Sequence, residues 1–477
     1  MTEQLTELLR RRLKRHEPLF NAIRCLADSV GGFSSRTSVA TSVYLVGGFV
    51  RDLFLEAIFS RPAIVRDIDA VITGMPSNGL SQLAALMARN FGGIRSAKCV
   101  ESGFPVMKIY LRDFPGVIDV ALARGREVST GPLHRDFRFD IDGVAIDEDL
   151  QRRDFTMNAV ALRLKREGED LSFLVEDPVR GIGDMERRCI RAIGIAGDRF
   201  FEDPIRQIRA VRFACQLSDA GFAIDAETLA AIRRVYPETF RSIPQEPLTQ
   251  ETGRALKADA IGLFRLFRET GIASLSFPLF SSLGDDQIQA LQKTIAVVGD
   301  DLDENAVWAP LLFLVARRRL ASQWPIGDAP PDSAFRRVIE PAARSLRLPG
   351  EIVDEGLWLS RLWLHAERPY PLTLLENFGR WMKDRPSRRR VLSLYGALAT
   401  AQGLVPADVD HHFRSIESRS FPLSREELRG FFQRHAIGQG PAREAMIRHA
   451  RESHLQGRCD SKEECMEEAL RYHRSRN

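Results

Sequence analysis

The segment Val46-Gly-Gly-Phe-Val-Arg-Asp52 decides the fold of the first part of this chain. The apolar run 42–46 stops at two glycines, a pattern typical of a buried strand that ends in a tight turn, and residues 49–59 then have the pattern of a helix. Glycines let the backbone approach a phosphate group, and a helix N-terminus attracts anions. A plain tight turn is the simpler interpretation of the two glycines alone, but Arg51 adds a forked donor that suits phosphate oxygens.

Three carboxylates follow in apolar surroundings. Asp67 and Asp69 stand two residues apart in Val65-Arg-Asp-Ile-Asp-Ala-Val-Ile72, so in a strand they share one face. Asp119 lies in the apolar run 117–122, where an unpaired carboxylate would be costly. Mg²⁺ binds carboxylates together with substrate phosphates, and two such ions could activate a hydroxyl and stabilise leaving pyrophosphate. A lone D-x-D pattern is more often a solvated turn or a cap, so this interpretation needs its context.

The rest of the chain divides into two regions by its apolar pattern. Residues 106–111 and 117–122 are further predicted strands, and residues 154–164 are a strand or a short mixed segment. After about residue 195, apolar residues recur three and four apart, which predicts helices up to the C-terminus. Breaks rich in proline and glycine at 324–331 and 438–441 indicate loops between helical units.

Size and composition exclude several classes of protein. The 477 residues predict two to four structural units, and 44% hydrophobic with 28% charged residues fits a soluble globular protein. The N-terminus lacks the apolar segment of a secretory signal, and we expect neither a membrane span nor a protein partner. The six cysteines form no C-x-x-C pair and have no accompanying histidine cluster, so we expect a reducing cytoplasm and no structural zinc site or disulfide framework. A net charge of +4 permits a polyanionic partner without requiring one.

Four motifs occur in a fixed order and carry a family resemblance. They are Leu45-Val-Gly-Gly-Phe-Val-Arg-Asp52, Arg66-Asp-Ile-Asp69, Arg152-Arg-Asp-Phe-Thr-Met-Asn-Ala159 and Glu202-Asp-Pro-Ile-Arg-Gln-Ile-Arg-Ala-Val-Arg-Phe213. Over about residues 42–260 the chain resembles the class II tRNA nucleotidyltransferase and poly(A) polymerase family. The resemblance implies an α+β fold, in which a nucleotidyltransferase head with a polymerase-β-like mixed sheet precedes an all-helical neck, body and tail. The boundaries we expect are 1–165 for the head, 166–260 for the neck, 261–400 for the body and 401–477 for the tail.

The resemblance also implies a role for each motif. In the first motif, Gly47, Gly48 and Arg51 would hold the triphosphate of the nucleotide. Asp67 and Asp69 would bind Mg²⁺, and Asp119 would be the third catalytic carboxylate, which acts as a base or orients the primer hydroxyl. The terminal ribose 3′-OH would then attack the α-phosphate in line, while the protein contributes positioning and charge neutralisation.

The third and fourth motifs would bind the remainder of the nucleotide. Arg153, Asp154 and Asn158 would bind its sugar and join the head to the neck. Asp203 would accept from the exocyclic amine of C or A, and Arg206 would donate to ring acceptors, so that U and G are rejected. Asp203 also stands before a proline, which is an ideal N-cap sequence, and we favour base recognition over capping.

The motifs leave the product partly open. We expect C and A addition from CTP and ATP to the CCA end of tRNA, because the end of the chain looks like a tRNA-binding tail. The segments that carry this likeness are Phe421 to Leu428, Ile437 to Pro441, Gly457 and Lys462 to Glu464. The basic cluster 385–390 would suit phosphate contact or form a solvated face. A poly(A) polymerase, a partial CC- or A-adding enzyme, a non-catalytic RNA-binding relative and transfer to a small molecule are the alternatives. Two departures from the family bear on this choice: Arg124 to Glu127 is one residue out of step, and Pro247 replaces an arginine.

Overall fold

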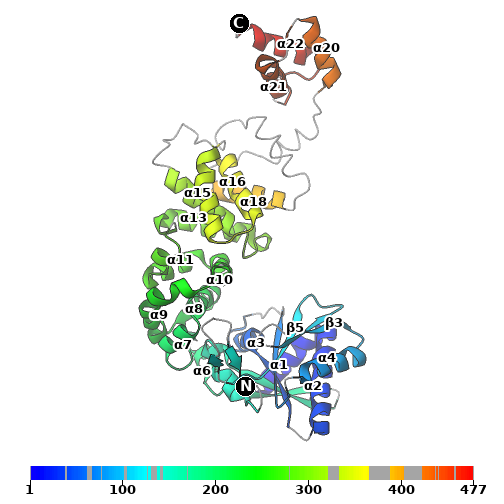
Figure 1. The fold of residues 1–477 in the computed structure, drawn as a ribbon, viewed down its shortest axis with the longest axis vertical. Coiled ribbons are helices and arrows are strands. Elements are labelled where there is room, and N and C mark those ends of the chain that lie inside the picture. The colour runs from blue at the N-terminus through cyan, green and yellow to red at the C-terminus, as the bar shows by residue number, and fades with distance from the viewer. Residues whose placement is uncertain are drawn as a thin grey trace. The chain divides into compact units, whose positions relative to one another are not determined.

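The computed structural model describes residues 2–475, except 38–39, 62–66, 77, 101–104, 126, 130–136, 140–142, 169, 279, 321–331, 365–386, 402–421, 436, 439 and 456–457. The chain forms two compact units. The N-terminal unit comprises residues 1–243 with 269–272, and the C-terminal unit comprises residues 244–268 with 273–477. Figure 1 shows strands in the first of these and helices in the second.

A seven-stranded mixed sheet forms the framework of the N-terminal unit, in the order β3-β4-β5-β2-β1-β8-β9. The β2–β5 pair is parallel, and the other neighbours in this sheet are antiparallel. The strands are β1 (Ser42–Val46), β2 (Ile68–Thr73), β3 (Ile94–Val100), β4 (Val106–Leu111), β5 (Val117–Leu122), β8 (Ala161–Glu167) and β9 (Asp170–Glu176). Short pairs add β6 (Glu127–Ser129) with β7 (Phe137–Phe139), and β10 (Cys189–Ile190) with β11 (Ala223–Ile224).

Helices of the same unit contact the sheet or continue from it. The first four contact one another or the sheet: α1 (Thr2–Lys14), α2 (Glu17–Thr37), α3 (Gly47–Phe59) and α4 (Gly79–Asn90). The later ones are α5 (Ile146–Gln151), α6 (Gly181–Glu186), α7 (Ala196–Glu202), α8 (Ile205–Gln216) and α9 (Ala226–Thr239), with single 3₁₀ turns η1 (Thr156–Asn158) and η2 (Phe240–Ser242).

Most predicted elements of this unit are confirmed. The strands at 42–46, 106–111 and 117–122 have the predicted bounds, and the mixed segment 154–164 contains η1 and the start of β8. Two expectations are wrong. The strand β9 lies beyond residue 165 yet pairs with β8, so the head sheet extends to residue 176. The predicted neck is therefore not all-helical, and it also contains β10 and β11.

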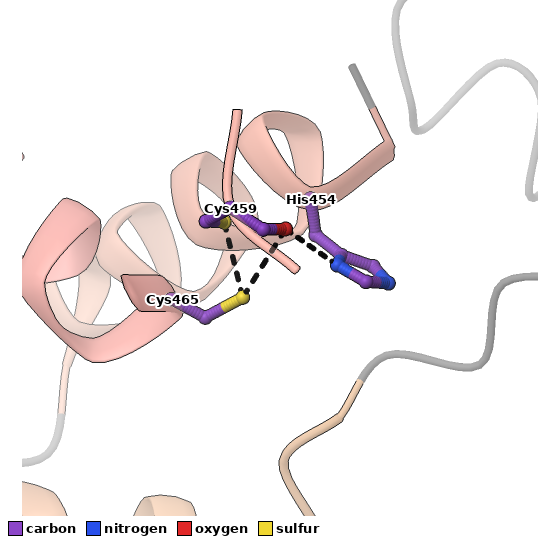
Figure 2. A group of neighbouring side chains, drawn as sticks. All are labelled: His454, Cys459 and Cys465. Carbon is purple, nitrogen blue, oxygen red and sulfur yellow. Dashed lines mark hydrogen bonds between the residues drawn. The ribbon is translucent and has the colours of Figure 1, made fainter. Parts of the chain in front are cut away.

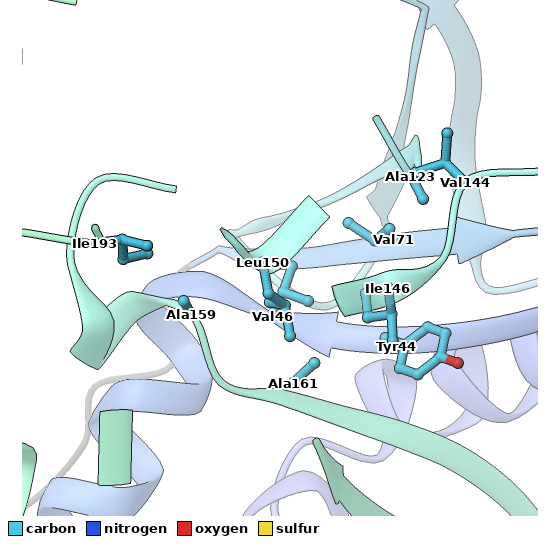
Figure 3. Close-up of a cluster of buried hydrophobic side chains, with 10 residues drawn as sticks. All are labelled: Tyr44, Val46, Val71, Ala123, Val144, Ile146, Leu150, Ala159, Ala161 and Ile193. Carbon is cyan, nitrogen blue, oxygen red and sulfur yellow. The ribbon is translucent and has the colours of Figure 1, made fainter. Parts of the chain in front are cut away.

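A hydrophobic cluster lies on one face of this sheet, beside the first and third sequence motifs. Strands β1 and β2 contribute Tyr44, Val46 and Val71 to this cluster. Val144, just before α5, and Ile146 and Leu150 of α5 belong to the same cluster. Figure 3 shows the cluster, whose members are Tyr44, Val46, Val71, Ala123, Val144, Ile146, Leu150, Ala159, Ala161 and Ile193. Val46 directly precedes Gly47, so burial of this core fixes the end of β1 from which the glycine turn begins.

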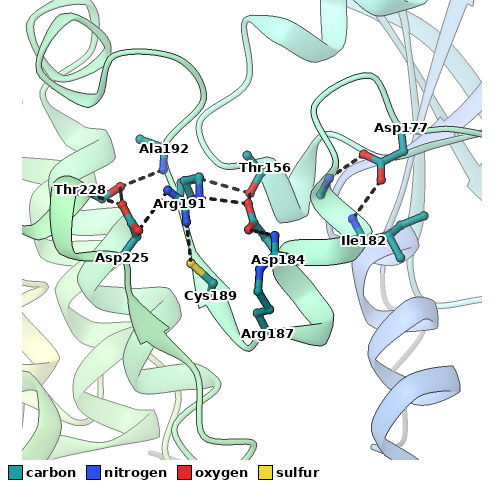
Figure 4. Close-up of polar contacts among 11 residues, drawn as sticks. Thr156, Asp177, Ile182, Asp184, Arg187, Cys189, Arg191, Ala192, Asp225 and Thr228 are labelled. Atoms are coloured by element: carbon teal, nitrogen blue, oxygen red, sulfur yellow. Dashed lines mark hydrogen bonds and ion pairs between the residues drawn. The ribbon is translucent and has the colours of Figure 1, made fainter.

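A chain of polar contacts connects the third motif to the helices that follow it (Figure 4). The Thr156 hydroxyl donates to the buried carboxylate of Asp184 at 2.8 Å, and Arg191 lies between Asp184 and Asp225, at 3.4 and 3.1 Å. Asp225 caps α9 by accepting from the backbone N–H of Thr228. Because each buried polar group has a partner, the third motif and α9 are held in one arrangement.

The C-terminal unit is helical in all of its described elements, as predicted for the body and tail. Its helices are α10 (Gln245–Ala258), α11 (Ala260–Thr270, which ends in the N-terminal unit), α12 (Ile272–Ser276), α13 (Asp285–Val298), α14 (Trp308–Leu320), α15 (Asp332–Ser345), α16 (Gly350–Leu364), α18 (Ser387–Ala401), α20 (Arg425–Arg434), α21 (Pro441–Leu455) and α22 (Lys462–Arg474), with the 3₁₀ turns η3 (Phe280–Ser282) and η4 (Gly299–Asp301). No helix within the described ranges is both long and apolar enough to cross a bilayer.

Two sequence features of this unit have a structural role. Pro247 lies in the first turn of α10, where a missing N–H is tolerated. Arg390, from the predicted basic cluster, forms a buried ion pair with Glu355 that joins α18 to α16, so this member of the cluster is neither a solvated face nor a phosphate contact. Arg385, Phe421, Gly457 and the break at 324–331 lie outside the described residues.

Candidate active site

A row of four neighbouring residues crosses the middle of the sheet and forms the base of the site. Val46 of β1 is paired with Asp69 of β2, Asp69 with Asp119 of β5, and Asp119 with Lys108 of β4. Directly paired residues project to the same face of a sheet. The register therefore brings Asp69 and Asp119, which are fifty residues apart in sequence, side by side on one face, as the sequence predicts for two of the three carboxylates.

The glycine turn passes close to the first of these carboxylates. Gly47 has φ +75°, and a Cβ at this position would lie 2.9 Å from Asp69 Oδ2 and 3.7 Å from Arg153 Nη1. A side chain would be strained by the backbone conformation and would also collide with Asp69. The turn then continues into α3, whose first residues carry Gly48 and Arg51 to the same cavity.

This cavity has a volume of about 540 Å³, within the usual range for sites that bind small molecules. Its lining combines carboxylates from the strands with guanidinium groups from the motifs and from α8. The charged lining residues are Arg51, Asp69, Asp119, Arg124, Asp149, Arg152, Arg153, Asp154, Asp203, Arg206, Arg209 and Arg212. Ten of the eleven site residues predicted from the sequence thus border one cavity, Gly47, Gly48 and Asn158 included.

Asp67 is the predicted site residue that does not line the cavity. It directly precedes β2, is exposed, and its Oδ1 accepts a hydrogen bond of 3.1 Å from the backbone N–H of Val117. Its charge nevertheless reaches Asp69, whose pKa it helps to raise. Asp67 lies just before β2 and its carboxylate is engaged by the end of the neighbouring strand, so a shared face with Asp69 stays a prediction.

The electrostatics of the two paired carboxylates favour a bound cation. Burial raises the pKa of Asp69, and the charges of Asp119 and Asp67 raise it further, against an opposing effect of Arg153. Asp69 is open to the cavity, but it is surrounded by enough protein for burial to dominate its pKa. Asp119 Oδ2 pairs with Lys108 Nζ at 2.6 Å, whereas its Oδ1 is buried with no hydrogen-bond partner. An unpartnered carboxylate oxygen beside a second carboxylate is the donor arrangement that a hard divalent ion requires.

Asp154 is the centre of a second network at the cavity. Burial alone would raise its pKa, but the Arg209 guanidinium at 2.7 Å and hydrogen bonds from Asn158 and the Phe155 N–H outweigh it and lower the pKa. Asn158 in turn accepts from Arg51 Nη1 at 3.1 Å. Arg51, Asp154 and Asn158 therefore act as one connected unit, with Arg209 as an additional member.

Arg153 is held by a carboxylate that the sequence did not indicate. Its guanidinium donates to Asp149 Oδ2, at 3.0 Å from Nη2, and Asp149 also accepts from the Arg124 N–H at 3.1 Å. The Asp149 side chain is only 6% exposed. Its position four residues before Arg153, on a short helix, was the available signal.

Asp203 and Arg206 lie together at the cavity, at the junction of α7 and α8. Asp203 ends α7, and its side chain makes no capping bond to α8, so the N-cap alternative is wrong. Its Oδ2 lies 3.8 Å from Arg206 Nε, and Arg206 also donates to the backbone oxygen of Arg152 at 3.1 Å. The Asp203 side chain is 47% exposed, so its carboxylate is accessible to a ligand.

An aromatic ring supports the arginines on this side. The Phe213 ring has the guanidinium carbons of Arg51 and Arg212 at 5.1 and 3.8 Å from its centroid, and that of Arg209 at 6.0 Å. Guanidinium groups over a ring gain cation–π attraction and lose mobility. Arg209 also pairs with Asp154, and the supporting role of Phe213 had no sequence signal.

Comparisons with known proteins agree with this geometry. The family of poly(A) polymerase head domains matches residues 43–191. A multifunctional CCA protein of Alkalilimnicola ehrlichii is 31% identical over 349 residues, which cover 69% of this chain and 76% of the relative. A CCA-adding enzyme of Lactobacillus delbrueckii subsp. bulgaricus is 33% identical over 277 residues, which cover 57% of this chain and 60% of the relative. The crystal structure of the Bacillus stearothermophilus CCA-adding enzyme in complex with CTP has the same fold, with a TM-score of 0.62, 22% identity and coverage of 95% of this chain and 98% of that one.

Proposed function

Because the chain belongs to the family of CCA-adding enzymes, the class II tRNA nucleotidyltransferases, we propose that it adds C and A from CTP and ATP to the 3′ end of tRNA without a template. The observation that carries the proposal is the register pairing of Asp69 with Asp119 beside the Gly47 turn, in a cavity with seven arginines. Carboxylates for a cation and guanidinium groups for a triphosphate are the two needs of nucleotidyl transfer.

The residues present fit a divalent cation. Asp69 and the orphaned Oδ1 of Asp119 would hold Mg²⁺, and Asp67 would join them if it exchanged its bond to the Val117 N–H. When bound, Mg²⁺ supplies charge neutralisation for the attacking oxygen and for the leaving pyrophosphate. Lys108 balances part of the negative charge of Asp119 in the absence of the ion.

The protein groups position the reactants. The Gly47–Gly48 turn lets the backbone approach the triphosphate, and Arg51, held by Asn158 and Asp52, presents its guanidinium edge to phosphate oxygens. Asp119 would accept the proton of the primer 3′-OH, or orient that hydroxyl, as it attacks the α-phosphate. Pyrophosphate leaves from the opposite side of the phosphorus atom, so the transfer is in line.

Base selection would rest on Asp203 and Arg206. The exposed Asp203 carboxylate would accept from the exocyclic amine of C or A, and Arg206 would donate to the adjacent ring acceptor. Arg206 is only 15% exposed and is anchored on the Arg152 carbonyl, so its direction is set before the nucleotide arrives. U and G present the opposite donor pattern at that edge and leave both groups unpaired.

The experiment supplies the purified chain with Mg²⁺, a tRNA transcript that lacks its 3′ CCA, and each labelled NTP separately and in combination. We expect growth by C, C and A and then arrest. Unlimited A incorporation on any RNA would instead identify a poly(A) polymerase. Arrest after CC, or A addition only to tRNA that already ends in CC, would identify a partial enzyme. Binding of tRNA without incorporation at any Mg²⁺ concentration would refute catalysis.

A further inference from the structure

Three metal-binding side chains meet in the C-terminal helices, far in sequence from the catalytic motifs. His454 lies in the last turn of α21, Cys465 in the first turn of α22, and Cys459 between the two helices. One ligand atom of each lies within 4.8 Å of the others. Exposed fractions of 5%, 2% and 0% for His454, Cys459 and Cys465 show that the group is buried. Burial distinguishes it from a chance surface cluster.

Figure 2 shows the two thiols in contact and the imidazole hydrogen-bonded to the carbonyl oxygen of Cys459, a bond that His454 Nδ1 would exchange for a metal ion. The two sulfur atoms are 3.0 Å apart, and His454 Nδ1 lies 2.7 Å from the carbonyl oxygen of Cys459. Two thiolates on one tetrahedral zinc ion are about 3.8 Å apart, because each Zn–S bond is about 2.3 Å. The sulfur atoms would have to separate by less than about 1 Å to admit the ion, which side-chain rotation can provide.

We propose that His454, Cys459 and Cys465 bind one zinc ion, with Asp460 or a water molecule as the fourth ligand. Thiolate and imidazole are the donor set that zinc prefers, whereas Mg²⁺ prefers the oxygen donors of the catalytic cavity. The exposed Asp460 carboxylate lies 3.9 Å from His454 Nδ1. Binding converts both thiols to thiolates and releases two protons to solvent.

The surroundings of the group support metal rather than catalytic chemistry. Both cysteines are almost completely buried, so neither thiol is open to a substrate in solution. Both sulfur atoms belong to the hydrophobic cluster that joins α20, α21 and α22. A disulfide would use the two cysteines but would give no role to the buried imidazole, whereas a zinc ion uses all three side chains.

A zinc ion at this position would join the end of α21 to the start of α22. The hydrophobic cluster of these helices is small, its buried members being Leu423, Leu428, Phe431, Phe432, Met446, Ala450, Cys459, Cys465 and Ala469. Small cores gain much of their stability from a structural metal. The sequence predicts no zinc site because the ligands follow an H-x₄-C-x₅-C spacing without a C-x-x-C pair, and only the helix-turn-helix packing brings them together.

The test measures metal content of the full chain, purified under reducing conditions without chelator from cells supplied with zinc. We expect about one zinc ion per chain by mass spectrometry of the elements, and its loss in Cys465→Ser and in His454→Ala. Cys99→Ser changes a half-exposed cysteine on β3 and should keep the ion. Asp69→Ala should also keep it, which separates this site from any zinc in the catalytic cavity. Replacement by Co²⁺ should give sulfur-to-cobalt charge-transfer bands that Cys465→Ser abolishes.

Two results would overturn the proposal. One is a folded, reduced chain that holds no zinc and acquires none on titration. The other is a chain that is lighter by two hydrogens without reductant and yields a Cys459–Cys465 linked peptide, which would identify a disulfide. Because Cys465→Ser could fail to fold, the unmodified chain provides a second measurement. Its melting temperature should fall when a chelator removes zinc and recover when zinc, but not Mg²⁺, is returned.

Discussion

The strand residues and the arginines that line the catalytic cavity, here called its strand wall and its helix wall, differ in how their charges are paired. On the strand wall, Asp69 and Asp119 are brought together by register, and Asp119 keeps one buried oxygen without a hydrogen-bond partner. On the helix wall, the arginines are already engaged: Arg51 by Asn158, and Arg209 by Asp154. The strand wall therefore has only Lys108 against its two carboxylates, whereas the arginines of the helix wall are fixed in place by carboxylate and amide partners.

This difference separates what a ligand must supply from what the fold supplies. Clustered carboxylates repel one another, and Lys108 offsets only part of this repulsion, so a bound cation would relieve the strand wall further. The arginines of the helix wall repel one another less, because Asp154 offsets the charge of Arg209 and the Phe213 ring contacts three of the guanidinium groups. We therefore expect substitutions on the strand wall to change metal dependence, and substitutions on the helix wall to change nucleotide choice or stability.

The largest effect should come from removal of the central carboxylate. Asp69→Ala should lower the rate of incorporation by roughly 1,000-fold or more, because stabilisation of several kcal/mol at the reacting phosphate depends on the cation. Single-turnover incorporation of CTP into tRNA lacking its CCA end measures it. Asp170→Ala changes a paired carboxylate at the sheet edge and should leave the rate intact. A rate within tenfold of the unmodified chain would remove Asp69 from the metal site.

Arg206→Ala should weaken base selection more than turnover. We expect the preference for CTP over UTP to fall by roughly 10- to 100-fold, because a site that hydrogen-bonds its substrate rejects analogues through unpaired groups. The ratio of kcat/KM values for the two nucleotides is the measurement, with Arg241→Ala as an exposed arginine control on η2. An equal loss for both nucleotides would assign Arg206 to structure or to phosphate binding.

Asp154→Asn should act on stability, with a defined dependence on pH. Loss of the charge opposite Arg209 should lower the free energy of unfolding by about 2 kcal/mol at pH 7. The folded-state pKa of Asp154 is depressed, so its contribution is fully present above the unfolded value of about 3.9 and is lost as pH falls through the folded pKa. Urea unfolding of the unmodified chain and of Asp154→Asn at pH 7, 5 and 3.5 measures this contribution. The difference between their free energies of unfolding should be the same at pH 7 and 5 and smaller at pH 3.5.

The exposed pair of Asp170 with Lys14 offers a matched comparison for that experiment. Asp170→Asn removes a carboxylate whose pKa is also lowered, but at the surface, where solvent screens the interaction. Its effect should be much smaller at every pH. A difference between unmodified chain and Asp154→Asn that grows toward low pH would contradict the assigned direction.

The smallest effect should follow from Lys108→Met, which leaves Asp119 without its ammonium partner. The hydrogen bond to Asp119 raises the pKa of Lys108, so the side chain stays charged and competes with a metal ion. We expect the Mg²⁺ concentration for half-maximal incorporation to fall by roughly 3- to 10-fold, since a neighbouring positive charge disfavours a cation. Lys165→Met, on β8, is the control. An unchanged Mg²⁺ requirement would place the ion away from Asp119.

The sequence predicted the central strands and most of the cavity, and its failures have physical reasons. The apolar runs of β1, β4 and β5 are bounded by glycine or charge, so they were recognised with their limits. By contrast, β3 and β9 stand at the edges of the sheet, where charged and apolar residues mix and no continuous apolar run marks the strand.

The same distinction applies to the site. The two-residue spacing of Asp67 and Asp69 predicts a shared face, and the motifs supply the remaining named residues. The roles of Lys108 and Asp149 could not be predicted, because each depends on strand register or helix contact across distant segments. The group of His454, Cys459 and Cys465 was missed for a related reason, since a spacing rule cannot foresee ligands that converge from two helix ends.

The Phe213 ring, with arginines arranged over it, has a consequence for repeated catalysis. Side chains that are already immobilised lose little rotational freedom when a nucleotide binds, so the entropic cost of ordering them is met once, during folding. An enzyme that adds several nucleotides to one RNA would then present the same arginine conformation to each incoming nucleotide. The rate of successive additions, and not only the affinity for each nucleotide, would then depend on Phe213.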